Sequence, residues 1–289
     1  MAHWPTTDED NVDSEGKSLR RRTRVADGAR TSRVPAVERA IAILRLLENK
    51  NVDRAGRTVS SIARTLHLNK STCSNILHAL ESNGFVKYDV VHKAYRLGAG
   101  LIGLSVNARN QAFPSVAVPH MQALVDKIGF TCVAFERLPT GDFVVVGSVN
   151  NWKDIKVTID VGQRFPPSAP VFSRIALAWS SRAEVETYIA KGLLKRFTKQ
   201  SKTDPDRLLE ELARTRRDGY TVGIGEYYLA NTIIAAPVFS VERDTCRGIC
   251  TIEFTSEVSP EMIPQYALAV RDTGRAITQA LREDVGNHP

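Results

Sequence analysis

The sequence predicts a two-domain α+β protein, in which a small helical domain with a β-hairpin precedes a larger domain of strands and helices. Three observations lead to this prediction. The 289 residues are enough for two ordinary domains. Apolar residues recur at helical spacing up to residue 80, whereas apolar runs rich in β-branched residues begin at residue 131. The excess positive charge also lies in the first third of the chain.

The basic residues divide the chain into two unlike parts. The formal net charge is +7, yet residues 111–289 hold 21 Lys and Arg against 21 Asp and Glu. Residues 17–110 hold 18 basic and 6 acidic side chains, a net charge of +12. This asymmetry favours a first domain that meets a polyanion, although a solvated basic face would look the same by charge alone.

Composition argues against several other classes of protein. A hydrophobic fraction of 43% with 25% charged residues is normal for a globular protein. No apolar run reaches the roughly 18 residues of a membrane helix, and the acidic first 16 residues lack the apolar centre of a secretory signal. The four cysteines fit neither a disulfide framework nor a zinc spacing. We therefore expect no metal, no cofactor, no membrane partner and a reduced, cytoplasmic compartment.

Residues 1–33 are polar and charged and cannot bury a core, so they predict a disordered basic tail. The run KSLRRRTR within it suits phosphate contacts, or serves only to keep the chain soluble. Residues 34–98 then predict a compact domain. Pro35 suits the first turn of its first helix. The apolar stripe of that helix comprises Val37, Ala40, Ile41, Leu44 and Leu47.

Two further helices and a hairpin follow within residues 34–98. We expect Ser60 to cap the second helix and Asn69 to cap the third. Asn83-Gly84 ends the third helix in the left-handed conformation that glycine tolerates. The runs FVKY and AYRL then form the arms of a β-hairpin. Three helices and a hairpin in this order predict a winged helix-turn-helix.

The third helix has an outer face without a carboxylate, which is unusual for a surface helix. Hydroxyls, amides and cations can donate to phosphate oxygens or read base edges, whereas an acid would be repelled by DNA. We therefore predict a DNA-binding surface. Its candidate residues on the helices are Ser60, Ser61, Lys70, Ser71, Thr72, Ser74, Asn75 and His78, and those on the hairpin are Lys87, His92 and Lys93. The alternative is a helical domain used for protein contacts.

Residues 99–113 predict a linker helix, ended by Pro114, before a second domain at residues 114–285. Strands are expected at 131–137, 142–149, 154–160, 232–239 and 248–254. Helices are expected at 171–179, at 203–220 and at 259–281, the last kinked or started at Pro264. Asp204 is the predicted cap of the second of these helices, whose apolar stripe is Leu208, Leu209 and Leu212.

Motifs for catalysis are missing from the sequence. It contains no GxSxG, P-loop, Rossmann glycine pattern or HExxH, and its six histidines are dispersed. His120, beside Pro119, is expected to start a helix and not to act as a general base. The prediction is that the protein is not an enzyme; the alternative is a metabolite-binding module or enzyme whose helical domain contacts proteins.

The run TVSSIARTLHLNKSTCSNILHALESNGFVKYDVVHKAYRLGAGLIGL resembles the DNA-binding domain of the IclR family of bacterial transcriptional regulators. The matching features are Lys70-Ser71-Thr72 at the start of a helix, Gly84-Phe85 at its end, and Tyr95-Arg96-Leu97-Gly98 after the hairpin. Downstream, GQRFPPSAPVFSRIALAW and RRDGYTVGIGEYYLANTIIAAPVF are similar to segments of that family's effector-binding domain. The resemblance spans about residues 34–285.

The resemblance implies a GAF-like effector domain, a linker helix that aids assembly, and a homodimer or homotetramer on a pseudopalindromic operator in the bacterial cytoplasm, at the nucleoid when bound to DNA. It implies repression or activation in response to a small organic molecule, such as an organic acid or aromatic compound. In the DNA-binding run, Asn69 stands where the family often has a proline, and Ser74 and Asn75 stand where it often has a His-Arg pair. Operator sequence therefore does not transfer from relatives.

The resemblance also suggests where the effector binds. The implied residues are Phe165, Ser168, Ala169, Val171, Gly223, Asn231, Ile233, Glu253 and Thr255. Here the family's cysteine is replaced by Ile233, a family acid by Gly223, and a Ser-x-Ser pattern by the run from Glu253 to Thr255. Three interpretations of Glu253 stay open. It faces the cavity and selects a cationic or hydroxylated effector, it is neutralised by a neighbour such as Lys156 or Arg137 so that an acid still binds, or it points to solvent.

Overall fold

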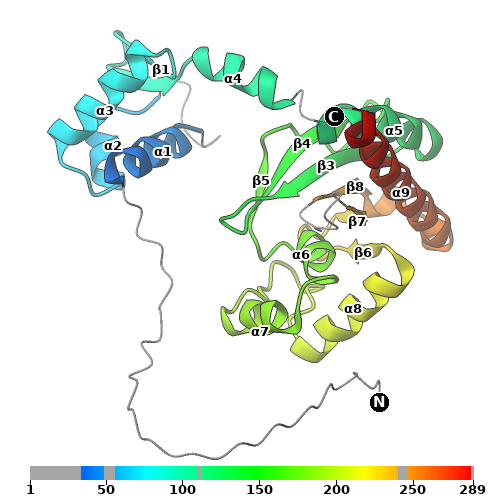
Figure 1. Ribbon diagram of the computed structural model, residues 1–289. Coiled ribbons are helices and arrows are strands. Elements are labelled where there is room, and N and C mark those ends of the chain that lie inside the picture. The colour runs from blue at the N-terminus through cyan, green and yellow to red at the C-terminus, as the bar shows by residue number, and fades with distance from the viewer. Residues whose placement is uncertain (1–33, 49–55, 110–111, 240–246, 288–289) are drawn as a thin grey trace, which may run out of the picture. The chain divides into compact units, whose positions relative to one another are not determined.

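The computed structural model describes residues 34–48, 56–109, 112–239 and 247–287. The predicted tail at residues 1–33 lies outside these ranges. The chain divides into two compact units, Met1–Ala99 and Gly100–Pro289 (Figure 1). No helix in the described ranges is long and apolar enough to span a membrane.

The N-terminal unit is a winged helix-turn-helix, as predicted. Its helices are α1 (Pro35–Glu48), α2 (Val59–Thr65) and α3 (Lys70–Ser82), and strands β1 (Val86–Asp89) and β2 (Ala94–Leu97) pair antiparallel as the wing. A bridge between Arg57 and Tyr95 ties the segment before α2 to β2. The core of this unit comprises Ile43, Leu47, Ile62, Ala63, Cys73, Leu77, Leu80, Val86 and Tyr95.

The predicted stripe of α1 is rotated in the structure. Val37 and Ile41 are 53% and 45% exposed, whereas Ile43 and Leu47 are 0% and 8% exposed. The apolar residues of α1 cover more of its circumference than one stripe needs, so periodicity alone did not select the buried side.

The C-terminal unit is built on a six-stranded antiparallel sheet in the order β5-β4-β3-β8-β7-β6. The strands are β3 (Thr131–Arg137), β4 (Phe143–Val149), β5 (Arg164–Phe165), β6 (Thr221–Ile224), β7 (Asn231–Val238) and β8 (Arg247–Phe254). The helices are α4 (Gly100–Arg109), α5 (Ala112–Ile128), α6 (Pro170–Leu177), α7 (Arg182–Ala190), α8 (Pro205–Asp218) and α9 (Ile263–Asn287). Two short 3₁₀ turns, Thr255–Glu257 and Pro260–Met262, precede α9.

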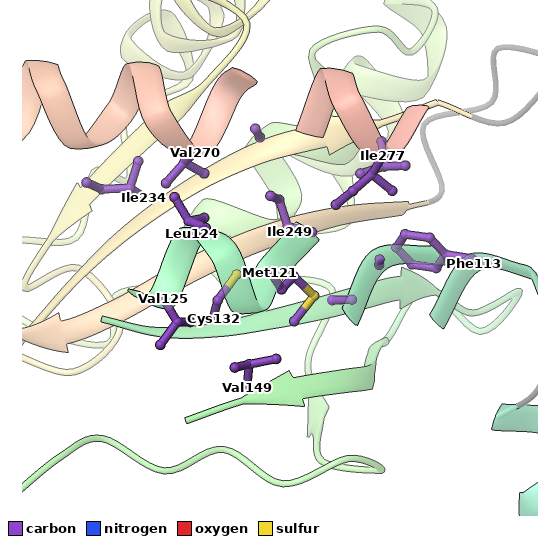
Figure 2. Close-up of a cluster of buried hydrophobic side chains, with 14 of the residues drawn as sticks. Phe113, Met121, Leu124, Val125, Cys132, Val149, Ile234, Ile249, Val270 and Ile277 are labelled. Atoms are coloured by element: carbon purple, nitrogen blue, oxygen red, sulfur yellow. The ribbon is translucent and has the colours of Figure 1, made fainter. Parts of the chain in front are cut away.

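The sheet has a separate core on each face. Helices α5 and α9 cover one face, where Met121 and Leu124 of α5 and Val270 and Ile277 of α9 pack on alternate residues of the strands, such as Ile249 (Figure 2). Helix α6 packs on the other face, against the opposite set of strand residues. Helices α7 and α8 then pack against the far side of α6 through a smaller cluster of buried residues.

Several predicted elements need correction. Residues 154–160 form no strand, although the carbonyl of Ile159 accepts a hydrogen bond from Ser148 and keeps this segment beside β4. Helix α5 starts at Ala112, so Pro114 lies in its first turn and does not end a helix. Pro119 lies inside α5, and His120 is therefore in the middle of a helix and not at its start. Leu209 of α8 is 49% exposed, so the inward stripe consists of Leu208 and Leu212.

Candidate functional site

The turn between α2 and α3 brings the two helices into the helix-turn-helix arrangement. Thr58 caps α2 by accepting the N–H of Ser61 at 3.2 Å, so the prediction that Ser60 is the cap was wrong. Ser60 is instead an exposed hydroxyl in the first turn of α2. His67 adopts the left-handed conformation, with φ 52°, between the helices. Asn69 occupies the cap position of α3 as predicted, but its side chain makes no capping hydrogen bond.

Helix α3 turns a polar face to solvent. Cys73, Leu77 and Leu80 are buried on its inner side. The predicted DNA-binding residues of this helix lie on the other sides: Lys70, Ser71, Asn75 and His78 are exposed, and Thr72 and Ser74 are half-buried. The one acid of the helix, Glu81, is half-buried in the last turn and accepts the backbone N–H of Tyr88 at 3.3 Å. The outer face of α3 therefore presents donors and a cation without a carboxylate in its first three turns.

The wing is shaped by Asp89. Its carboxylate accepts the backbone N–H groups of Val91 and His92, forms an ion pair with Arg96 at 2.6 Å, and lies 3.1 Å from Nδ1 of His92. The hydrogen bonds from His92, with the charge of Arg96, lower the pKa of Asp89 below its ordinary value. The acid of the wing is thus neutralised by its neighbours. The candidate wing residues Lys87, His92 and Lys93 are all exposed.

Six of the predicted effector residues lie together on the α6 side of the sheet. Phe165, Ala169, Val171 and Ile233 belong to one buried cluster. Gly223 pairs with Ile233, and a Cβ at Gly223 would lie only 2.5 Å from Val171, so glycine permits α6 to approach β6. Ser168 is buried at the entrance to α6.

The remaining three predicted effector residues are distributed differently. Asn231 is half-buried at the start of β7 and shares the face of Ile233 by strand alternation. Glu253 follows Ile252, a member of the α6-side cluster, and so points to the opposite face. Thr255 accepts a hydrogen bond from Thr232, the residue paired with Glu253. Glu253 and Thr255 therefore do not share a surface with Ile233, which corrects the predicted pocket.

The environment of Glu253 decides between the three interpretations given above. Its side chain is 1% exposed, which rules out a solvent position. Lys153 forms an ion pair with it at 3.1 Å, and the side-chain amide of Asn151 donates to it at 3.2 Å. Glu253 is thus neutralised by a neighbour, but by Lys153 and not by Lys156 or Arg137. Lys156 instead donates to the backbone oxygen of Asn151.

A buried ion pair between Arg174 and Glu226 was not predicted from the sequence. Arg174 lies on α6 and is 3% exposed, and Glu226 follows β6 and is 4% exposed. Nη1 and Nη2 of Arg174 donate to Glu226 at 2.7 and 3.1 Å, Nε donates to Thr221, and Nη2 also donates to the carbonyl of Val222. The available signal was a single arginine inside the otherwise apolar run VFSRIALAW.

Further charges extend this pair toward the surface. Lys202 lies 3.7 Å from Glu226 and 3.1 Å from Glu211. Burial acts to raise the pKa of Glu211, but the hydrogen bond from Lys202 and the charges of Arg174, Lys202 and Arg214 lower it overall. A surface pocket of about 440 Å³ between α8 and β6 is bordered by Lys202, Glu211, Arg214 and Glu226. Among the residues described, no group of His, Cys, Asp and Glu side chains could hold a metal ion.

A winged helix-turn-helix whose third helix presents a face without a carboxylate in its first three turns, joined to a separate α+β unit, defines a DNA-binding transcriptional regulator. Residues 36–90 match the IclR helix-turn-helix domain, and residues 108–279 match the C-terminal domain of the bacterial transcriptional regulator IclR. The chain therefore belongs to the IclR family of bacterial transcriptional regulators, as the sequence resemblance predicted.

Known regulators are similar to the chain over most of its length. The HTH-type transcriptional repressor AllR of Salmonella typhi is 28% identical over 267 residues, which cover 91% of this chain and 96% of AllR. The HTH-type transcriptional regulator KipR of Bacillus subtilis (strain 168) is 24% identical over 246 residues, 85% of this chain and 96% of KipR. The crystal structure of an IclR-type regulator from Alicyclobacillus acidocaldarius superposes with a TM-score of 0.79 at 27% identity, covering 86% of this chain and all of that one.

Proposed function

We propose that this regulator binds a pseudopalindromic operator in the bacterial cytoplasm as a homodimer or homotetramer, through α3 and the wing of each copy. The observation that carries the proposal is the acid-free outer face of α3, exposed from Lys70 to His78. Two copies related by a two-fold axis would present their α3 helices to successive major grooves, about 34–36 Å apart. The proposal includes no catalytic step.

The residues of the interface have distinct proposed roles. Asn75 and His78, one turn apart on the exposed face, can donate to or accept from base edges in the major groove. Phosphate contacts are proposed for Lys70 and Ser71 in the first turn of α3. They are also proposed for the hydroxyls of Ser60 and Ser61 in the first turn of α2. Lys87, His92 and Lys93 of the wing would add phosphate contacts beside the groove. These last contacts position the protein and carry no sequence information.

The exchange Lys70→Glu tests this interface. It places a carboxylate at the start of α3, opposite the phosphates, and we expect binding to a duplex from the DNA upstream of the gene to weaken by about a hundredfold or more. Lys199→Glu makes the same charge change at an exposed lysine of the C-terminal unit and serves as the control. Fluorescence anisotropy gives both affinities, and circular dichroism checks the fold. Equal affinities for the two variants would instead favour a helical domain that contacts proteins.

We further propose that a small aromatic molecule binds on the α6 side of the sheet and controls DNA binding. Phe165 and Phe172 stack there with ring centroids 4.6 Å apart, and Tyr227 meets Phe165 edge-on at 5.8 Å. An aromatic ligand could replace one of these ring–ring contacts with a similar contact of its own, so that little stabilisation would be lost. Arg174 and Glu226 neutralise each other beside this cluster, so the pair by itself does not select an acid over a cation.

Two adjacent isoleucines provide a matched test of this effector site. Ile233 faces the α6 side, whereas Ile234 faces α5 and α9. Benzoate, benzylamine and benzyl alcohol, which differ in charge but not in ring, would be compared for their effect on DNA affinity. Ile233→Ala should shift the midpoint of the active probe by about tenfold, and Ile234→Ala should leave it unchanged, although each loses about 2–5 kcal/mol of stability. Equal midpoints in the two variants would rule out this location.

A further inference from the structure

Five arginines line one groove of the C-terminal unit. The groove has a volume of about 370 Å³ and lies between the end of α8 and the second half of α9. Arg216 and Arg217 come from the last turn of α8, and Arg271, Arg275 and Arg282 come from α9. None of the lining residues that the structure describes is an acid. It shares no lining residue with the α6-side cluster.

Local structure explains how the five side chains converge. Arg271, Arg275 and Arg282 recur at intervals of four and seven along α9, which puts them on one side of the helix. That side borders the buried stripe of Val270 and Ile277. The three arginines of α9 therefore lie next to the side of the helix that packs on the sheet.

Helix α8 ends against α9 because its terminating residue is glycine. Gly219 adopts the left-handed conformation, with φ 76°, at the end of α8. A Cβ at this position would lie 3.3 Å from the side-chain carbons of Arg271 and 3.8 Å from a terminal nitrogen of Arg275. Glycine thus allows the basic end of α8 and the basic side of α9 to meet.

The positive charge of the groove is only partly compensated. Arg217 pairs with its neighbour Asp218 at 2.8 Å, and Arg271 pairs with its neighbour Asp272 at 2.8 Å. Arg216 donates to the carbonyl of Ala178, which is neutral. Within the described part of the chain, Arg275 and Arg282 have neither an ion pair nor a hydrogen bond from their guanidinium groups. Like charges repel, so gathering them is unfavourable until an anion binds.

One end of the groove is aromatic. Trp179, just after α6, and Phe239, just after β7, meet edge to face with ring centroids 5.3 Å apart. Trp179 is half-buried, so part of its ring is open to the groove. A flat aromatic ring can pack on such a surface while a charged group meets the guanidiniums.

We propose that this groove binds a nucleoside phosphate, with the phosphates on the arginines and the base against Trp179. The volume lies within the range of about 300–1,000 Å³ that is usual for small-molecule sites. An acidic protein segment or the DNA backbone would use the guanidiniums but not the ring. The site would hold the end of α8 to α9, so its ligand should stabilise the C-terminal unit.

Calorimetry on the full-length chain with ADP, pyrophosphate and adenosine tests the proposal. ADP should bind more tightly than pyrophosphate, and adenosine should bind most weakly. The double exchange Arg275→Glu and Arg282→Glu should weaken ADP binding by about a hundredfold or more. Arg207→Glu, at an exposed arginine in the first turn of α8, should leave it within about twofold, as expected for an exposed charge outside the site.

Fluorescence gives a second readout in a variant with Trp4→Phe and Trp152→Phe, in which Trp179 is the remaining tryptophan. ADP should change its emission, and the double arginine exchange should abolish that change. Failure of the wild-type chain to bind ADP at millimolar concentration would overturn the proposal. So would equal ADP affinity in the double-exchange and Arg207→Glu proteins. Loss of duplex affinity or of assembly in the double exchange, without ADP binding by the wild type, would assign the groove to DNA or to another copy.

Discussion

Arg174 carries a positive charge into the interior of the C-terminal unit, and Glu226 neutralises it there. The guanidinium donates to both oxygens of Glu226, to the hydroxyl of Thr221 and to the carbonyl of Val222, so its charge is well hydrogen-bonded. The pair also ties α6 to the loop after β6. The position of the α6-side cluster therefore depends on this contact.

Removing one partner of this pair should be costly. We expect Arg174→Met to destabilise the C-terminal unit by about 3–5 kcal/mol, because Glu226 would keep a buried charge without its partner. The double exchange Arg174→Met and Glu226→Leu should recover part of this loss. Urea unfolding, followed through the transition of the C-terminal unit, measures both values.

Arg182 supplies the control for this prediction. It forms an exposed pair with Glu186 at 2.8 Å, with side chains 78% and 63% exposed. Arg182→Met should cost only about 0.3–0.5 kcal/mol, since solvent screens the pair. Similar losses in the two arginine variants would mean that the Arg174–Glu226 pair contributes little beyond packing.

Single residues of the site differed in how far the sequence could predict them. Exposure of the predicted DNA-binding residues on α3 followed from helical periodicity, since the buried positions define the exposed ones. Glu253 was predicted to need a partner, but Lys153 is 100 residues away in sequence and only the fold brings them together. The buried ion pair of Arg174 could not be predicted either, because its partner Glu226 follows α7 and α8 in the chain.

Elements with strong local signals were predicted well. Strand β3 has the predicted bounds, and α8 starts at Pro205 behind Asp204, whose side chain accepts the N–H groups of Asp206 and Arg207. The left-handed Gly84 follows α3 as expected. In each case the capping residue or the run of β-branched residues specifies the element without tertiary contacts.

Elements that depend on tertiary contacts were missed. Strand β6 has only four residues, and one of them is Gly223. Its pairing with β7 therefore sets its conformation. Helix α7 is an exception, because it was not predicted although Ser181 and Glu184 form a full capping box, which is a local signal. Residues 154–160 alternate as a strand would, yet they run beside β4 without joining the sheet.

The whole chain separates two tasks between its two compact units. The N-terminal unit holds the excess positive charge and the acid-free face of α3, and the C-terminal unit holds the sheet with its two cores. The division was visible in the sequence because charge and periodicity both change along the chain. The arrangement of the six-stranded sheet was not, since strand order depends on contacts between distant segments.

The central claim is that α3 and the wing meet the phosphates of duplex DNA, and the salt dependence of binding tests it most directly. Lys70, Lys87 and Lys93 would all be exchanged for Gln, with Lys191, Lys195 and Lys199 exchanged for Gln as the control. Each lost phosphate contact should reduce the slope of log affinity against log salt by about 0.9. Two copies on the operator would lose six contacts, so we predict that the first variant loses about 5.4 units of slope and the control almost none. Equal slopes for the two variants would contradict the account.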